Sequence, residues 1–416
     1  MTIGISNVSN ALQKVIMPYI QDNFNKQTIL LDQVKRNKGV TFMNDYFYAP
    51  IRTSRNSGVT NLANDTSTLL SGSSSIGQAY VGVKILTGTF DISKLVLDAT
   101  KTAKGAVENQ LTAQAKWLSS DFAKGVNRQM YGDGAGVVSE VSATGTTTVV
   151  MTYKGTACTA ADTRTQDNYG SINGDIAHTE YIYAGQILGM GTAGSSIGTV
   201  SSVGTGGTVV FANAAIGTAG DPVFILDGAA VGAGTSEITG LKAALSSSTG
   251  TSTYAALARS TTGWTPQVDS TSEALTQVAL EKVYLSAKKF SQLGDTYAIF
   301  MNKTLYRKYG DILTSMRRVV NETELLGGWK GLEFAAGAGA VGVFLDFDVP
   351  DGEVFIVNLD SLTMCQVSDM QWLEDPNSGA LQRRRDAITY QATMAWFMNM
   401  LCLAPAANGH LLRKTA

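Results

Sequence analysis

The chain has 416 residues, 32 basic and 34 acidic side chains and a formal net charge of −2, which argues against a surface built entirely to grip nucleic acid. Charged residues make up only 16% of the chain and hydrophobic residues 44%. This balance favours surfaces that end up against other protein, although an ordinary large α/β enzyme can share it.

The cysteines and the start of the chain exclude several classes. Cys158, Cys365 and Cys402 form no CxxC pair, which predicts buried free thiols rather than a disulfide framework or a zinc knuckle. The first residues lack the pattern of a signal peptide, and no uncharged apolar run reaches about 18 residues. We therefore expect no membrane span and synthesis in the cytoplasm.

Residues 1–38 are predicted to form an N-terminal arm. Two weak helical stripes follow one another with Pro18 between them, and their members are Val8, Leu12, Val15 and Tyr19, then Ile20, Phe24, Leu31 and Val34. An apolar stripe on a short terminal helix needs cover, and another subunit is one candidate.

Residues 39–91 are predicted to form a long hairpin. Alternation places Phe42, Tyr46 and Tyr48 on one face of the outgoing run, and Val81, Val83 and Ile85 on one face of the return run. The connection from Arg52 to Gly77 is 26 residues rich in Ser, Asn, Thr and Gly. Such a connection is unusual inside a compact domain. A projecting loop that embraces a neighbour explains it better than a disordered tip.

The strongest predicted helix runs from about Thr102 to Tyr131. Its apolar side chains recur at intervals of three or four: Val107, Leu111, Ala115, Leu118, Phe122, Val126 and Met130. At 1.5 Å per residue it would be roughly 45 Å long. Gly132, Gly134 and Gly136 follow and provide a C-terminal stop. A straight helix of this length is a strut.

Residues 137–235 are predicted to form a small β module, a barrel or a sandwich. The stretch 181–220 contains no charged residue, and short β runs alternate with Gly and Ser turns. Gly189, Gly191 and Gly194 spell GxGxxG, but no helix follows that could bind a pyrophosphate. We therefore expect no nucleotide site there.

From residue 236 onward the pattern is mixed α and β. Ser270 and Glu273 fit a capping box that opens a helix closed by Gly294, and its stripe is Leu275, Ala279, Val283, Ala287 and Phe290. YAIFM, VGVFL, GEVFIVNL and SLTMCQV read as strands, and RRDAITYQATMAWFMNMLCL reads as one or two long closing strands.

The segment DFDVPDGE resembles a calcium loop superficially, with Asp346, Asp348 and Asp351. Pro350 stands where a ligand is needed, and no glutamate follows at the required distance. Pro-Asp-Gly between two apolar runs instead predicts a hairpin turn.

Little in the sequence suggests catalysis. His178 and His410 are the only histidines, and neither lies near a nucleophile motif. His178 is expected in a loop or at a strand edge, and His410 is expected to be exposed. A carboxylate-pair glycosidase has no fixed spacing, but nothing positive supports one. We therefore predict no catalytic, cofactor-binding or metal-binding residue, and no enzyme.

Arginines are the candidates for contact with other subunits. A solvated face is the default interpretation of such basic clusters, followed by pairing with acidic groups on an adjacent subunit and then by contact with DNA. Two lie in the predicted hairpin and the others in two clusters: Arg52, Arg55, Arg317, Arg318, Arg383, Arg384 and Arg385.

The order of these parts resembles the major capsid proteins of tailed phages, which share the Hong Kong 97-like fold. The resemblance covers nearly the whole chain and is most specific in VNRQMYGDGAG, at Asn127, Arg128, Tyr131, Gly132, Asp133 and Gly134. It is supported by ITGLKAAL and GWTPQVDS, around Gly240 and Trp264, and by LLGGWKGLEF and VGVFLDFDVPDGEVFIVNLDSL.

The resemblance implies an α+β fold with five parts. Residues 1–38 would be the N-terminal arm, 39–91 the extended E-loop hairpin and 92–136 the spine helix of the P-domain. Residues 137–235 would be an inserted small all-β domain, and 236–416 the A-domain with the remaining P-domain strands.

The implied function is mechanical. Such subunits form hexamers and pentamers that close into an icosahedral virion shell around the genome, after assembly in the host cytoplasm. The implied partners are a separate scaffolding protein, a portal, optionally a decoration protein, and packaged double-stranded DNA bound non-specifically. An encapsulin-like nanocompartment shares the fold and is the main alternative. A β-rich tail or adhesin protein would lack the strut helix.

Two departures from the namesake are informative. Its hairpin tip carries a lysine that forms a covalent crosslink, whereas residues 39–83 contain no lysine and Lys38 and Lys84 lie only at the base. We therefore expect a shell held without that chemistry. The arm is also too short to contain a cleavable scaffold domain, which is why a separate scaffolding protein is expected.

Overall fold

The computed structural model describes residues 28–37, 41–61, 71–99, 110–134, 136–143, 145–152, 182–191, 196–204, 208–213, 217–219, 221–225, 237–246, 253–261, 263–315, 323–324, 330–336, 339–350, 352–374, 381–384 and 388–415. They fall into two compact units. The smaller contains the described residues of 87–124 and 370–395, and the larger those of 28–86, 125–369 and 396–416. None of the described helices is long and apolar enough to cross a membrane.

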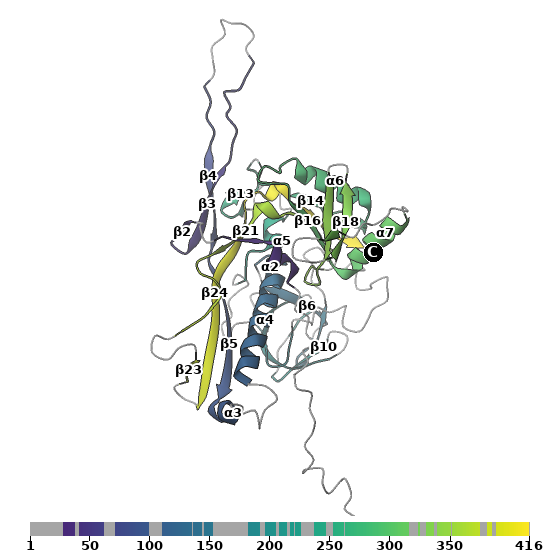
Figure 1. The fold of residues 1–416 in the computed structure, drawn as a ribbon. Coiled ribbons are helices and arrows are strands. Elements are labelled where there is room, and N and C mark those ends of the chain that lie inside the picture. Colours follow the sequence, from purple (N-terminus) through teal and green to yellow (C-terminus); the bar gives the residue numbers. More distant parts are fainter. Residues whose placement is uncertain are drawn as a thin grey trace, which may run out of the picture. The chain divides into compact units, whose positions relative to one another are not determined.

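The smaller unit packs a helix against a sheet. Strand β24 (Thr389–Cys402) pairs with β5 (Lys84–Ser93), β22 (Gln371–Trp372) and β23 (Leu381–Arg383). The first part of α4 (Gln110–Tyr131) lies beside β5, after the short helix α3 (Lys94–Ala99) (Figure 1). Gly88 allows this approach, because a Cβ there would lie 2.9 Å from Leu118 Cδ1. The predicted strut is confirmed from residue 110 onward, and residues 102–109 lie outside the described part of the chain.

A seven-stranded sheet dominates the larger unit. Its strands, in spatial order, are β14 (Gln267–Asp269), β25 (Gly409–Leu411), β20 (Val354–Asn358), β16 (Tyr297–Met301), β19 (Gly339–Leu345), β18 (Lys330–Ala336) and β17 (Thr323–Glu324). Helices α6 (Gln277–Lys288) and α7 (Lys303–Ser315) contribute to its core. Every residue of β16 and β20 is buried, as expected for central strands covered on both faces. The strands predicted from YAIFM, VGVFL and GEVFIVNL are confirmed.

The predicted hairpin around Pro350 is wrong. Strand β19 pairs with β16 in parallel, β20 pairs with β16 antiparallel, and β16 therefore lies between the two. The chain does turn, with Gly352 at a φ of 73°. Local residues specify a turn, but they do not specify which strand a segment pairs with.

The predicted capping box is also wrong. Thr276 is the N-cap of α6, and its hydroxyl accepts a hydrogen bond from the Ala279 N–H at 3.2 Å. Glu273 lies in β15 (Glu273–Ala274), which pairs with β26 (Lys414–Thr415), and its carboxylate accepts from Lys414 Nζ at 2.8 Å. The predicted apolar stripe is buried at Leu275, Ala279, Val283 and Ala287.

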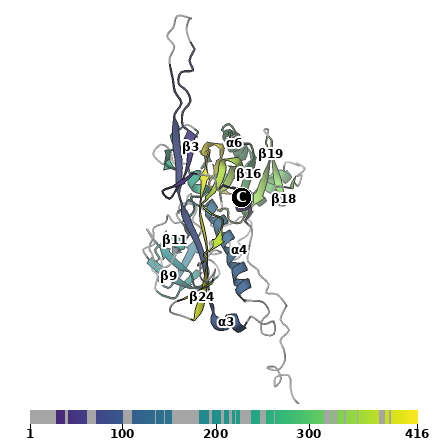
Figure 2. The ribbon, with the colours of Figure 1, turned by 60° about the vertical axis from the view of Figure 1, so that its left-hand side comes forward.

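The β-rich segment folds as a closed barrel (Figure 2). Around the barrel the order is β10 (Thr208–Phe211), β7 (Thr148–Thr152), β6 (Val137–Ala143), β11 (Pro222–Ile225), β8 (Ile187–Met190) and β9 (Ser196–Val203). Gly189 lies in β8, and β9 is the next described element, so strand and not helix surrounds the GxGxxG pattern. Gly194 and His178 lie outside the described residues.

Smaller elements complete the larger unit. The short helix α2 (Ile29–Gln33) leads to β1 (Lys35–Asn37), which pairs in parallel with β21 (Leu362–Gln366). Strand β21 pairs in turn with β24. Other short elements are α5 (Leu241–Ala244), β12 (Thr253–Tyr254), β13 (Leu257–Ala258) and the 3-10 turns Leu359–Ser361 and Pro405–Ala407.

The predictions about the arm and the thiols can be compared with the structure only in part, because some of their residues lie outside the described part of the chain. Leu31 and Val34 of the second stripe are buried, whereas Pro18 and the first stripe lie outside the described residues. Cys365 and Cys402 are buried free thiols, as predicted, and Cys158 lies outside the described residues. Burial raises the pKa of Cys365 to about 12 and that of Cys402 to about 11, so neither is a reactive thiolate.

Candidate interaction surfaces

The predicted hairpin is a three-stranded sheet of β2 (Thr41–Met43), β3 (Tyr46–Arg52) and β4 (Ile76–Gly82). The outgoing run is not one strand, because Asn44 and Asp45 form a tight turn with φ values of 49° and 63°. Asn and Asp tolerate this left-handed conformation better than most residues, so the turn separates β2 from β3. Sequence alternation alone missed it.

The turn changes which aromatic side chains share a face. Phe42 pairs with Phe47, with ring centroids 5.5 Å apart, so its predicted alignment with Tyr46 and Tyr48 is wrong. Tyr46 and Tyr48 do share a face, together with Tyr80 of β4. Ring centroids of Tyr80 lie 5.2 Å from Tyr46 and 5.4 Å from Tyr48.

The two faces of the hairpin base have different surroundings. Phe47 and Val81 are buried against Cys365 and Leu401, so this face is anchored to the larger unit's own core. On the opposite face Tyr46 is 40% and Tyr80 38% exposed. A cluster of rings with exposed edges and hydroxyl groups is typical of protein contact surfaces.

The predicted contact arginines have different environments. Arg52 lies at the outer end of β3 and donates from Nη2 to Ser74 Oγ at 2.9 Å, and Arg55 is exposed beyond it. In the smaller unit Arg384 forms an ion pair of 2.8 Å with Asp91, whereas Arg383 is exposed on β23. Arg52 and Arg55 belong to the larger unit, and Arg383 and Arg384 to the smaller one. Arg317, Arg318 and Arg385 lie outside the described residues.

The segment that carries the strongest resemblance holds the end of α4 in a buried polar cluster. Asn127 donates from Nδ2 to Asp346 Oδ2 at 3.1 Å and also to Asp348, and its Oδ1 accepts from the Leu31 N–H at 3.1 Å. Tyr131 donates its hydroxyl to Asp346 Oδ2 at 2.9 Å. Burial raises the pKa of Asp346, and the nearby Asp348 adds to that rise. Asp346 and Asp348 of the calcium-loop pattern thus bind protein donors, and Asp351 lies outside the described residues.

Gly240 fits against the same end of α4. A Cβ at this position would lie within 2.6 Å of the carbonyl oxygens of Gln129, Met130 and Gly132, so only glycine allows the approach. Arg128 forms an ion pair with Glu237 just before it. Two sequence segments that carry the resemblance therefore meet in space.

The prediction that His410 is exposed is wrong. The residue is 1% exposed, its ring is stacked on that of Phe355 with centroids 4.4 Å apart, and its Nε2 lies 3.2 Å from Glu353 Oε2. Lys242 Nζ lies 2.9 Å from Glu353 Oε1. Burial by itself would raise the pKa of Glu353, but Lys242 and His410 outweigh it and lower the pKa to about 2. No sequence spacing links these three residues, and this is why sequence reasoning missed the cluster.

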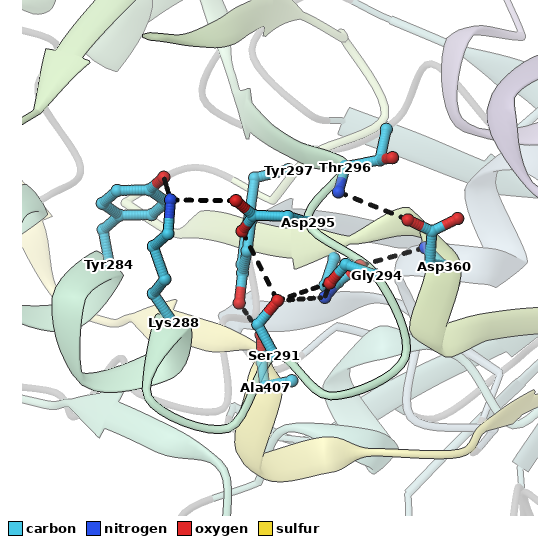
Figure 3. Close-up of polar contacts among 10 residues, drawn as sticks. Tyr284, Lys288, Ser291, Gly294, Asp295, Thr296, Tyr297, Asp360 and Ala407 are labelled. Carbon is cyan, nitrogen blue, oxygen red and sulfur yellow. Dashed lines mark hydrogen bonds and ion pairs between the residues drawn. The ribbon is translucent and has the colours of Figure 1, made fainter. Parts of the chain in front are cut away.

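Polar contacts also fix the loop between α6 and β16 (Figure 3). Lys288 Nζ lies 3.0 Å from Asp295 Oδ2, and the hydrogen bond between them raises the pKa of Lys288. The Thr296 N–H donates to Asp360 Oδ2 at 3.3 Å, and the Ser291 hydroxyl donates within the loop. These contacts are structural. Within the described ranges, no three His, Cys, Asp or Glu side chains are grouped to hold a metal ion.

Sequence comparison does not identify the chain: no protein-family model and no curated protein matches it. Structural comparison does find neighbours. The capsid asymmetric unit of cyanophage A-1(L) matches with a TM-score of 0.58 and 13% identity, over 100% of both chains.

Two further structures cover 100% of this chain and 96% of their own. They are the SrpI encapsulin of Synechococcus elongatus, at 7% identity, and Mycobacterium phage Adephagia, at 8%, each with a TM-score of 0.49. With a TM-score of 0.49, neither match distinguishes a capsid subunit from an encapsulin subunit. The full-length match to the cyanophage subunit identifies the fold: this chain is a mixed α and β protein with the fold of a tailed-phage capsid subunit.

Proposed function

We propose that the protein is the major capsid protein of a tailed double-stranded DNA phage. It would assemble as hexamers and pentamers into an icosahedral shell around the genome, without catalysis. The observation that carries the proposal is the match to the cyanophage A-1(L) capsid subunit, because it spans both chains from end to end. A partial match would support a shared domain only.

The hairpin geometry supports the proposal independently of the comparison. One face of its base is buried in the subunit's own core through Phe47 and Val81. The other face exposes the rings of Tyr46 and Tyr80, and Ile76 further along is 76% exposed. Apolar side chains that are a liability on a monomer become contacts in a closed assembly.

The role proposed for the arginines follows from their partners. Arg384 forms an ion pair with Asp91 in its own unit. Among the described arginines, Arg55 and Arg383 are therefore the better candidates for contact with an acidic group on another subunit. Arg317, Arg318 and Arg385 remain proposed contacts on sequence grounds. DNA is the weaker alternative, because the chain as a whole carries a net charge of −2.

The experiment is electron microscopy of the purified recombinant chain, alone and with the scaffolding protein expected to accompany it. We expect closed shells with pentameric and hexameric units. A chain that stays monomeric under both conditions would contradict the proposal.

The content of native particles separates the two shell functions. Packaged DNA, with a portal at one vertex, is expected for a capsid, whereas enclosed protein cargo would favour the encapsulin alternative. A β-rich tail or adhesin protein is disfavoured by α4, a helix of 22 residues. A decoration protein remains a proposed additional partner, to be sought in native virions.

A further inference from the structure

Helix α6 has two different faces. Ala279, Val283 and Ala287 are buried in the core that α6 shares with the seven-stranded sheet. On the opposite face Val278 is 74% and Leu285 44% exposed. About seven residues make two turns of a helix, so these two side chains lie in line along the surface. The packing of α6 within the subunit therefore does not explain why these two positions are apolar.

Two lysines lie on the same face as these apolar residues. Lys282 and Lys289 are exposed and each follows one of them by four residues, so all four side chains form one stripe, the α6 outer stripe. Neither ammonium group forms an ion pair or a hydrogen bond with any residue that the structure describes. Lys289 Nζ lies 5.7 Å from the centre of the Phe290 ring. The methylene groups of both lysines add to the apolar surface of the stripe.

The other charged groups of α6 lie on the opposite border of the stripe. Lys288 Nζ lies 3.0 Å from Asp295 Oδ2 and 3.4 Å from the Tyr284 hydroxyl, so the subunit itself supplies its partners (Figure 3). Glu281 is seven residues before Lys288 and therefore shares its border. The stripe thus has an unpaired positive charge at two positions on one border only.

We infer that the α6 outer stripe is a docking site for an amphipathic helix of a separate protein, one that carries acidic side chains along one border of its apolar seam. A helix fits because apolar side chains in line along α6 match the seam of a second helix packed beside it. Acidic side chains fit because Lys282 and Lys289 have no partner among the described residues. The inference concerns the folded chain and does not depend on the proposed function.

Other occupants fit the stripe less well. Nucleic acid would bind the two lysines and leave Val278 and Leu285 in water. Residues 1–27 of this chain contain two lysines and one aspartate, so that segment does not supply the acidic charge. Two apolar and two charged side chains give a weak contact by themselves, and a partner gains occupancy where many copies of the stripe are presented together.

Binding of two synthetic peptides tests the inference. Both are amphipathic helices of about 18 residues with a leucine seam. One has glutamates along one border of the seam, and the other has lysines at the same positions. Their binding to the purified full chain is measured by fluorescence anisotropy. We expect the glutamate peptide to bind about tenfold more tightly than the lysine peptide, with a preference that weakens as salt is added.

Variants of the stripe separate its charge from its apolar surface. Lys282→Glu combined with Lys289→Glu should weaken binding of the glutamate peptide about tenfold and strengthen binding of the lysine peptide. Val278→Ser combined with Leu285→Ser should weaken binding of both peptides, because both use the apolar line. Lys116→Glu, at an exposed position of α4, is the matched control and should change neither. Unchanged thermal unfolding would show that each variant is folded.

Three results would overturn the inference. The first is equal binding of the two peptides, or an equal effect of the Lys116 control. The second is a DNA duplex whose binding depends on Lys282 and Lys289 while peptide binding does not, which assigns the lysines to nucleic acid. The third is peptide binding that is lost in particles made from this chain alone, which assigns the stripe to a second copy. None of these bears on the proposed function, which fails only if no particles form.

Discussion

At the scale of single residues, Asn127 connects three parts of the larger unit. Its side chain bridges two buried carboxylates, Asp346 and Asp348, and also accepts from the main chain of Leu31. Asn127→Ala would remove one hydrogen bond from the Leu31 N–H and one from each of the two carboxylates, and all three groups lie in a buried site. We expect the free energy of unfolding to fall by about 2–4 kcal/mol in urea titration of the unassembled subunit. Thr112→Ala, at an exposed position of α4, should change it by less than about 0.5 kcal/mol; equal effects would contradict the assignment.

Glu353 predicts a dependence of stability on pH. Lys242 and His410 lower its pKa to about 2 in the folded chain, from an ordinary value of 4.5. A lowered carboxyl pKa contributes stability that is complete above the unfolded value and is lost as the pH falls towards the folded value. We expect Glu353→Gln to cost on the order of 3 kcal/mol near neutral pH and progressively less between about pH 4.5 and 2. Denaturant titrations across this range check it, and a difference that does not depend on pH would refute the ion-pair explanation.

At the scale of elements, the end of α4 illustrates how close packing selects glycine. Gly240→Ala would place a Cβ against three main-chain oxygens that cannot move independently. We expect a loss of about 2–4 kcal/mol in unfolding free energy. Gly125→Ala on the same helix is the matched change, because no described atom lies within 4 Å of its Cβ. That variant should gain about 0.5–1 kcal/mol from helix propensity. If both variants lose stability equally, the packing explanation is wrong.

At the scale of the whole molecule, the hairpin sequence predicts how assembled particles behave. Residues 39–83 contain no lysine, so no amine is available in the hairpin for an intersubunit amide crosslink. Mature particles boiled in detergent should therefore run as a single subunit band in denaturing electrophoresis. A covalent ladder of this subunit would contradict the prediction.

Several elements were predictable because their signal is local. Helix α4 and the strands β16, β19, β20 and β21 follow from apolar periodicity, since each buries one stripe or both faces whatever its neighbours are. The barrel was predictable as a β module, with a barrel and a sandwich as the two alternatives, and the structure shows the barrel. The pair Asn44–Asp45 is typical of a tight turn, but the alternation of the surrounding apolar residues predicted one continuous strand there.

The candidate surfaces were predictable only in outline. The sequence by itself determined a long hairpin without lysine, a strut helix and a chain with little charge, because composition and periodicity do not depend on pairing. The tertiary structure alone decided that β16 separates β19 from β20 and that His410 is buried beside Glu353. Each of these depends on contacts between residues far apart in the chain, whose free energy no local pattern of residues encodes.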